Sequence, residues 1–401
     1  MSRILIVVPP LAGHVNPTAA LGRALAERGH EVAWSGSELH LRPLLGESAT
    51  VFTTGAKLLR DQGGQGLAAV KSLWQGFVVP YARFSAKAVD GAVRAFEPDV
   101  IVVDQHTPAG AIAAHRHSVP WASIASSAME SGRPLRDLPK VEAWITDHLK
   151  ALWQAGGLPA ADFTDPRFSP YLVIALTSPA LVDPERFGAG AADGSSHAAQ
   201  TVFTGPLLGG RPAGPAFPWE RLDPGRAHVL VSMGTLAADV SAHFHARAAE
   251  AFHLAGERVQ AVVAGPPEIT EAYPEGTVVL PRVPVLDLMD RRALDAVLCH
   301  SGQNTVCESL AHGLPLVVAP IRHDQPVVAA QVAAAGAGLR VSFRRAGAHT
   351  LREAVDTVLG DGSFRSAAQQ IKAQFALDGG TDTAVPRLEQ LARQSAAASS
   401  D

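Results

Sequence analysis

Short apolar runs that alternate with helix-like segments constrain the fold of this chain more than any other feature. Ile4–Val8 is a continuous apolar run rich in β-branched residues, and Val100–Val103 is a second one that ends at Asp104. Such runs indicate strands buried on both faces of a parallel sheet. Segments with helical periodicity follow them at Pro17–Arg28 and Ala109–His115. This alternation predicts an α/β domain with helices on both faces of its sheet.

The same alternation resumes after an interruption near the middle of the 401-residue chain. Gly209–Pro218 is rich in glycine and proline, which is typical of a linker between domains. Beyond it the sequence predicts strands at His228–Ser232, Val259–Ala264, Thr277–Leu280, Ala296–Cys299 and Leu316–Ala319. We therefore expect two doubly wound α/β domains, at 1–208 and 226–378, joined by a linker at 209–225. Residues 379–401 should form a C-terminal helix that packs back on the first domain, with a disordered tail from Ser395.

The composition excludes several classes of protein. Lysine and arginine total 34 against 38 aspartates and glutamates, a net charge of −4, and no basic block is present for a nucleic-acid backbone. No stretch approaches the roughly 20 apolar residues that span a bilayer, and the amino terminus lacks a signal-peptide cleavage site. The two cysteines, Cys299 and Cys307, cannot build a disulfide framework. We expect a soluble, cytoplasmic protein without a nucleic-acid partner.

The strongest chemical signal is a junction between a strand and a helix. The buried strand ends at His300, a turn contains Gly302, and a helix begins near Asn304. Free N–H groups and the dipole at a helix start bind phosphate, and the side chains of His300, Asn304 and Thr305 could add donors. Any strand–turn–helix junction also needs a glycine and a capping residue. The motif alone therefore leaves both a phosphate site and a purely structural turn open.

Three further polar residues could bind hydroxyl groups. Glu308 lies about one helical turn after Thr305, where its carboxylate could accept two hydrogen bonds from the hydroxyls of a ribose. Asp324 and Gln325 precede the next helix and offer acceptors and donors for a polyol, although Asp324 could instead cap that helix.

These residues occur in an order that resembles a known family. His300–Glu308 reads His-x-Gly-x-x-Thr-x-x-Glu, Gly313–Pro320 reads Gly-x-Pro-x-x-x-x-Pro, and Asp324-Gln325 follows. Together they resemble the donor-sugar signature of the family 1 nucleotide-sugar glycosyltransferases of GT-B fold, which glycosylate antibiotics, macrolides and plant metabolites. The resemblance implies two Rossmann-like domains that face each other across a cleft. Ser301 departs from the family pattern, because it replaces the second glycine of the common His-Gly-Gly.

Two shorter segments fit the same family. Ser232–Thr235 resembles its Gly-Ser/Thr turn, and the donor diphosphate is then expected to contact Thr235, His300, Gly302, Asn304 and Thr305. Arg282-Val283-Pro284 resembles its Trp-Val-Pro-Gln segment, so Arg282 is expected to stack on the pyrimidine and Val283 to hold it through its backbone. The resemblance assigns Glu308 to the nucleoside, and Asp324 and Gln325 to the donor sugar.

The first domain carries a matching amino-terminal pattern. Gly13–Pro17 and Leu21–Val32 are similar to the family's, which implies that His14 is the general base and Asp104 its partner. Elementary chemistry agrees, because His14 lies in the turn before a predicted helix, whose dipole disfavours an imidazolium, so the neutral ring can take the proton of an acceptor hydroxyl. Asp104 would fix the tautomer of the His14 ring through a hydrogen bond. The chain has 16 histidines, most of them necessarily structural or solvated, and Asp104 could instead cap a helix.

The sequence also lacks several motifs of other enzymes. There is no Asp-x-Asp to hold a nucleotide sugar through a divalent ion, no Gly-x-Gly-x-x-Gly after the first strand, and no Gly-Lys-Ser/Thr loop. A nicotinamide dehydrogenase and a P-loop NTPase are therefore disfavoured. We expect no metal and no cofactor, with the helix start at 302–305, His300 and Thr235 neutralising the leaving diphosphate.

The sequence thus favours an inverting, metal-independent glycosyltransferase that moves a sugar from a UDP- or dTDP-sugar to a hydroxyl of a small hydrophobic natural product. Glu308 favours UDP, which offers two ribose hydroxyls. The acceptor should lie against the region that resembles the family least, 56–167, with the aromatic residues Trp74, Phe77, Tyr81, Phe84, Trp144 and Trp153. A nucleotide-sugar 2-epimerase-like isomerase and a non-catalytic GT-B partner protein are the alternatives. The protein could be a monomer or a homodimer.

Overall fold

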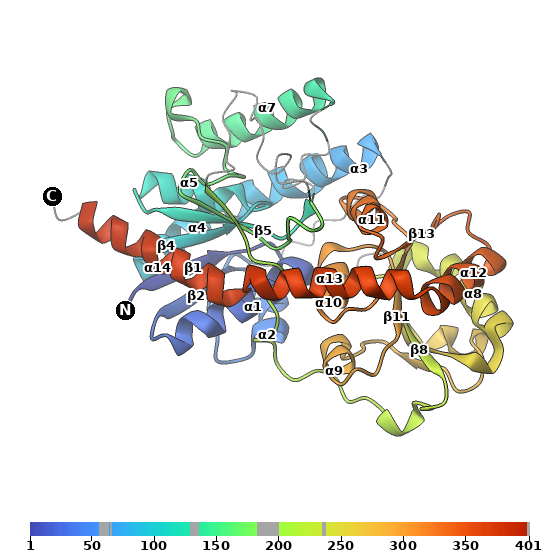
Figure 1. Ribbon diagram of the computed structural model, residues 1–401. Helices are drawn as coiled ribbons and strands as arrows, with labels where there is room; N and C mark the ends of the chain where they lie inside the picture. The colour runs from blue at the N-terminus through green and yellow to red at the C-terminus, as the bar shows by residue number, and fades with distance from the viewer. Residues whose placement is uncertain are drawn as a thin grey trace. The chain divides into compact units, whose positions relative to one another are not determined.

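The chain divides into two structural units. Figure 1 shows the computed structural model, which describes residues 1–55, 64, 66–128, 135, 137–182, 200–234 and 238–398. Unit 1 comprises Met1–Pro212 and Asp378–Asp401, and unit 2 comprises Ala213–Leu377. The chain therefore leaves unit 1, forms unit 2 as one continuous segment, and returns to unit 1 at its end.

Unit 1 is built on a parallel sheet of seven strands in the order β3-β2-β1-β4-β5-β6-β7. The strands are β1 (Arg3–Val7), β2 (Glu31–Gly36), β3 (Thr50–Thr53), β4 (Val100–Asp104), β5 (Trp121–Ala125), β6 (Leu172–Ala175) and β7 (Thr201–Phe203). The helices are α1 (Ala12–Glu27), α2 (Glu38–Leu45), α3 (Leu67–Lys71), the π-helix η1 (Ser72–Val78), α4 (Val79–Phe96), α5 (Pro108–Arg116), α7 (Pro139–Ala155) and α14 (Thr381–Ala398).

Unit 2 repeats this architecture with a parallel sheet of six strands in the order β10-β9-β8-β11-β12-β13. The strands are β8 (Ala227–Ser232), β9 (Val259–Ala264), β10 (Val278–Leu280), β11 (Ala296–Cys299), β12 (Leu316–Val318) and β13 (Gly338–Arg340). The helices are α8 (Ala238–Ala255), α9 (Val285–Asp290), α10 (Gln303–Ala311), α11 (Gln325–Ala334), α12 (Ala348–Gly360) and α13 (Gly362–Asp378). The predicted fold class, with two Rossmann-like parallel-sheet domains, is confirmed.

The central strands are apolar throughout because both faces of each sheet are covered. In β1, Leu5 and Val7 belong to a core with helices α4 and α5, whereas Ile4 and Ile6 belong to a core with α1 and α14. Successive side chains of a strand point to opposite faces, so a run without polar residues is what a doubly covered strand requires. No helix in the described part of the chain is long and apolar enough to cross a membrane.

The order of the strands determines where a site can form. In unit 1, β1 and β4 are neighbours. From β1 the chain continues to β2 on one side of this pair, and from β4 it continues to β5 on the other side. In unit 2, β8 and β11 stand in the same relation. The carboxyl ends of two such strands leave a space between their connections, where ligands of doubly wound sheets bind.

The start of the first helix and the C-terminal tail are among the boundaries that differ from the sequence-based expectations. Helix α1 begins at Ala12 rather than at Pro17, because the Leu11 carbonyl accepts the N–H groups of His14 and Val15 and starts the helix earlier. His14 therefore lies in the first turn of α1, not in the turn before it. The expected disordered tail from Ser395 is helical as far as Ala398, in keeping with the high helix propensity of alanine, and the residues beyond are outside the described ones.

Helix α14 joins the core of unit 1 and is held to the loop after α1 by a charged cluster. Its Val385 and Leu388 are buried in the same core as Ile4. The Arg28 guanidinium donates to both carboxylate oxygens of Glu389, at 2.8 and 2.9 Å, and His30 Nε2 lies 3.0 Å from Glu389 Oε1. These hydrogen bonds lower the pKa of the Glu389 carboxyl to about 2.

We expect this cluster to stabilise unit 1 in a pH-dependent way. A carboxyl whose pKa is lower in the folded state stabilises the protein above its unfolded pKa of about 4.5, and that stabilisation is lost as the pH falls towards 2. The Glu389→Gln variant should unfold more easily by up to about 1 kcal/mol at neutral pH, because solvent screens the pair. Urea unfolding at several pH values should show the difference from wild type disappearing in acid.

The exposed pair Arg352–Glu353, 3.9 Å apart, provides the control, and Glu353→Gln should change stability little at any pH. A Glu389→Gln deficit that persisted undiminished at low pH would show that packing of the side chain, and not its charge, stabilises α14.

Candidate active site

In unit 1, the ends of β1 and β4 bring His14 and Asp104 together. His14 Nδ1 lies 2.9 Å from Asp104 Oδ2. The Asp104 side chain is fully buried, whereas that of His14 is 12% exposed. An ionised carboxylate can only accept hydrogen bonds, so His14 Nδ1 carries the proton and Nε2 presents its lone pair. The contact therefore selects the tautomer that a general base needs.

Two further contacts hold the Asp104 carboxylate. The hydroxyl of Ser126 donates to Oδ2 at 2.5 Å, and its oxygen also lies 2.7 Å from His14 Nδ1. The backbone N–H of His106 donates to Oδ1 at 2.9 Å. Burial alone would raise the pKa of Asp104, but the charge and hydrogen bond of His14, together with Ser126, keep that pKa below its ordinary value. Asp104 is thus an anion inside the protein.

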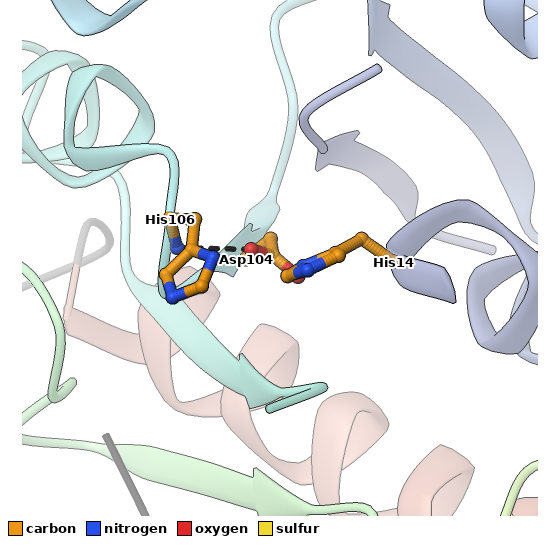
Figure 2. Close-up of side chains that lie close together, drawn as sticks. All are labelled: His14, Asp104 and His106. Carbon is orange, nitrogen blue, oxygen red and sulfur yellow. Dashed lines mark hydrogen bonds and ion pairs between the residues drawn. The ribbon is translucent and has the colours of Figure 1, made fainter. Parts of the chain in front are cut away.

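Ser126 and His106 were not identified from the sequence, although both follow a pattern that could have indicated them. Ser126 is the first residue after the buried strand β5, which pairs with β4, and His106 lies two residues beyond the end of β4. Polar residues directly after adjacent parallel strands meet at one edge of the sheet. Figure 2 shows His14 and His106 beside Asp104. The centroids of the two imidazole rings lie 4.9 Å apart.

In unit 2, the junction between β11 and α10 has the predicted strand–turn–helix form. Gly302 is the N-cap residue of α10, and the helix begins at Gln303, one residue before the expected Asn304. Ser301 has φ +69°, in the left-handed region that favours glycine, and its side chain is fully buried. The substitution of serine for the family's second glycine is therefore accommodated with the loop in a glycine-like conformation.

The ring of His300 occupies a space that two glycines leave open. A Cβ atom placed on either Gly234 or Gly302 would lie 2.6 Å from His300 Nε2. His300 Nδ1 lies 3.3 Å from the carbonyl oxygen of Ser232, and a carbonyl only accepts, so Nδ1 carries the proton. Burial lowers the pKa of His300, an effect that the Ser232 carbonyl and Asp324 oppose. The neutral ring thus presents a lone pair at Nε2, and a donor role towards diphosphate, as the sequence suggested, requires its protonated form.

The other predicted residues of unit 2 also follow the carboxyl ends of strands. Asn304 and Thr305 lie half-buried in the first turn of α10, and Glu308 is buried one turn further on. Arg282 is exposed and Val283 half-buried, in the loop between β10 and α9. Thr235 lies outside the described residues.

Asp324 and Gln325 begin α11, but neither behaves as a simple cap. Asp324 is the N-cap residue, yet its side chain makes no capping hydrogen bond. The Gln325 side-chain oxygen accepts the backbone N–H groups of Ile321 and Arg322, at 2.8 and 2.9 Å. Gln325 therefore closes the loop that carries Asp324, and its amide N–H groups are the part suited to a ligand. This loop-closing role was not anticipated from the sequence.

The aromatic residues proposed for an acceptor fall into two groups. Trp74, Tyr81 and Trp153 are buried and belong to the interior of unit 1. Phe77 and Trp144 are half-buried, and Phe84 is 39% exposed. The first group therefore belongs to the hydrophobic core, and the other three residues remain available to a ligand.

Comparisons with known proteins agree with this geometry. The family described as UDP-glucoronosyl and UDP-glucosyl transferase matches residues 219–374. The 4'-demethylrebeccamycin synthase of Lentzea aerocolonigenes is 27% identical, over 97% of this chain and 99% of that protein. The NDP-glycosyltransferase YjiC of Bacillus subtilis is 25% identical, over 96% of each chain. This chain is a family 1 glycosyltransferase. Like its relatives, the enzyme transfers sugars from nucleotide sugars.

Solved structures show the same GT-B fold. The glycotransferase of kitacinnamycin superposes with a TM-score of 0.77 at 22% identity, covering 97% of this chain and 99% of that one. The glycosyltransferase VinC, in complex with dTDP, has a TM-score of 0.75 at 18% identity, covering 98% of this chain and 100% of that one.

The packing of His300 against Gly302 generates a prediction for the enzyme. Gly302 has φ −66°, which alanine also adopts, so in Gly302→Ala only the added Cβ disturbs the site by displacing the His300 ring. Overpacking of this kind costs about 1–3 kcal/mol, which corresponds to roughly 5- to 150-fold weaker binding of a nucleoside diphosphate if the cost falls on the bound state. Calorimetric titration with UDP and dTDP measures this.

Gly347 offers a matched control, since it is the N-cap residue of α12, has φ −80°, and a Cβ on it would meet nothing within 4 Å. Gly347→Ala should leave nucleotide affinity unchanged. Equal nucleotide affinities of the two variants would mean that the position of the His300 ring does not affect binding of the donor nucleotide.

Proposed function

We propose that the enzyme is an inverting, metal-independent glycosyltransferase that transfers a sugar from UDP- or dTDP-sugar to a hydroxyl of a small hydrophobic natural product. The observation that carries the proposal is the buried Asp104 carboxylate, which faces Nδ1 of His14 and so leaves the lone pair of the ring on Nε2. Such a pair is suited to deprotonating an alcohol, which is the demanding part of forming a glycosidic bond.

The chemistry follows from these groups. His14 Nε2 takes the proton of the acceptor hydroxyl while its oxygen bonds to the anomeric carbon of the donor sugar. The bond between that carbon and the diphosphate oxygen breaks, and its electron pair leaves with the nucleoside diphosphate. Attack opposite the leaving group inverts the anomeric configuration. Asp104 stabilises the imidazolium that forms, because it remains ionised beside it.

When this bond breaks, the leaving diphosphate gains one negative charge, which donors of unit 2 can stabilise. The α10 start offers backbone N–H groups at Gln303 and Asn304, and the Thr305 side chain can add a donor. Fixed donors of this kind act without a metal ion, which agrees with the absence of Asp-x-Asp from the sequence. We assign the donor sugar to Asp324 and the amide N–H groups of Gln325.

The names of relatives support the class of acceptor. They include a zeaxanthin glucosyltransferase of Pseudescherichia vulneris and structures of spinosyn forosaminyl- and rhamnosyltransferases. The partly exposed Phe77, Phe84 and Trp144 of unit 1 would suit an apolar aglycone of that kind. The 2-epimerase alternative fits less well, since elimination and readdition need several acid/base carboxylates around the sugar, whereas the cluster of His14, Asp104 and His106 contains one carboxylate.

The proposal is tested by the His14→Ala variant. Loss of a general base should lower turnover by roughly 10²–10⁴-fold while nucleotide affinity stays nearly unchanged. The loss should be smaller with an acidic phenol than with an aliphatic alcohol as acceptor, because an acidic hydroxyl needs less help. Turnover is measured by release of nucleoside diphosphate and by detection of the glycoside.

The exposed His349, in the first turn of α12, provides the control, and His349→Ala should be as active as wild type. Near-wild-type turnover of His14→Ala with several acceptors would exclude His14 as the base. Formation of an epimerised nucleotide sugar in place of a glycoside would favour the isomerase.

The identity of the nucleotide gives a second test. Glu308 is buried on α10, and a carboxylate that accepts two ribose hydroxyls loses one charge-assisted hydrogen bond when the 2′-hydroxyl is absent, on the order of 1.5–3 kcal/mol. We therefore expect UDP to bind more tightly than dTDP, and Glu308→Ala to weaken UDP more than dTDP. Calorimetry with both nucleotides measures this, and equal losses would remove the support for UDP.

A further inference from the structure

We propose that His14, Asp104 and His106 form a binding site for Zn²⁺, and that a bound ion inhibits the enzyme. The site is separate from the donor chemistry, which needs no metal. Binding of the ion does not depend on the proposed reaction, whereas its inhibitory effect rests on His14 being the base.

The three side chains already lie at nearly the spacing of a coordination sphere. One ligand atom from each lies within 4.8 Å of the others. Figure 2 shows His14 and His106 next to Asp104. Zinc binds histidine nitrogen and carboxylate oxygen at about 2.0–2.2 Å, so tetrahedral ligand atoms are roughly 3–3.5 Å apart. His14 Nδ1 and Asp104 Oδ2, at 2.9 Å, are close to that separation, and the three ligand atoms, which lie within 4.8 Å of one another, would draw together around an ion.

The donor set selects the class of ion. Two imidazoles and one carboxylate suit Zn²⁺ and its neighbours Co²⁺, Ni²⁺ and Cu²⁺. Mg²⁺ instead requires six oxygen ligands in octahedral geometry. One ionised carboxylate and two neutral imidazoles leave a fourth position for water. The part of the His14 side chain that is exposed gives the ion a route of entry.

Binding of the ion changes the state of the His14 ring. In the resting pair, His14 Nδ1–H donates to Asp104. An ion that binds Nδ1 takes the place of this proton, which moves to Nε2 so that the ring stays neutral, and an ion that binds Nε2 occupies the lone pair directly. In each arrangement the lone pair that would take the acceptor proton is lost, so transfer stops.

Direct binding of Co²⁺ and Zn²⁺ to tag-free, EDTA-treated and desalted enzyme tests the site without reference to activity. Visible absorption of Co²⁺ and calorimetry with Zn²⁺ should both show one site. His106→Asn should weaken binding at least tenfold, as loss of a ligand does, while its backbone N–H to Asp104 is retained. His349→Asn, which removes an exposed histidine elsewhere, should bind as wild type does.

Activity gives the second readout. EDTA should leave transfer undiminished, Mg²⁺ or Mn²⁺ should give little gain, and Zn²⁺ should inhibit reversibly. Relative to its own rate without the ion, His106→Asn should need at least tenfold more Zn²⁺ than wild type for the same fractional inhibition. His106→Gln serves as a second variant. In the wild-type enzyme, Zn²⁺ should also protect His14 from acylation by diethyl pyrocarbonate, which mass spectrometry of the peptide that contains His14 measures.

Absence of Co²⁺ binding, or equal Zn²⁺ affinity of wild type and both His106 variants, would overturn the site. Binding that depends on His106 without inhibition of transfer would retain the site and overturn its effect. An enzyme with no transfer activity at all would refute the proposed function, while the Co²⁺ titration would still decide the metal site.

Discussion

A carboxylate buried in the interior of unit 1 is the constraint on which the candidate active site depends. Removing an ionised carboxylate from water costs several kcal/mol unless hydrogen bonds and an opposite charge compensate. Asp104 has no exposed side-chain surface, and it accepts from Ser126, from the backbone of His106 and from His14. These partners come from three different segments, so the fold must bring them together for Asp104 to remain charged. The orientation of His14 is a consequence of that requirement.

Unit 2 achieves order at its site by a different physical means. There the position of His300 depends on the absence of side chains at Gly234 and Gly302, and its tautomer depends on the Ser232 carbonyl. The loop at 321–325 is closed by the side chain of Gln325 rather than by a cap from Asp324. Steric exclusion and neutral hydrogen bonds thus dominate in unit 2, whereas charge compensation dominates in unit 1.

The sequence was sufficient for most of the fold, since strands covered on both faces must be apolar without interruption. β9 and β11 begin and end where the apolar runs predicted. β7 and β13 were not predicted, because each has three residues and lies at the edge of its sheet, where burial no longer demands an apolar run. The start of α1 was misplaced because Pro17 is typical of a first turn, and only the Leu11 carbonyl reveals the earlier start.

Side-chain detail at the site was harder to predict than the elements that carry it. The pairing of His14 with Asp104 was anticipated, and the structure brings the two together. The role of Ser126 was not anticipated, since a serine after a strand is common. Its partners Asp104 and His14 lie 22 and 112 residues away in the sequence. The lone pair of His300 and the loop closure by Gln325 depend on distances and backbone angles, which a sequence pattern does not contain.

The return of the chain to unit 1 has a consequence for how the protein is made and how it can be divided. Unit 2 is one continuous segment, whereas unit 1 needs both Met1–Pro212 and the chain from Asp378 onwards. During synthesis, unit 2 can therefore complete its core before unit 1 receives α14. Until then the face of β1 and β4 that includes Ile4 and Val102 lacks the cover that Val385 and Leu388 supply. A fragment cut at the linker would keep this surface open, so a chimera that exchanges the first half of two such enzymes must carry the last helix with it.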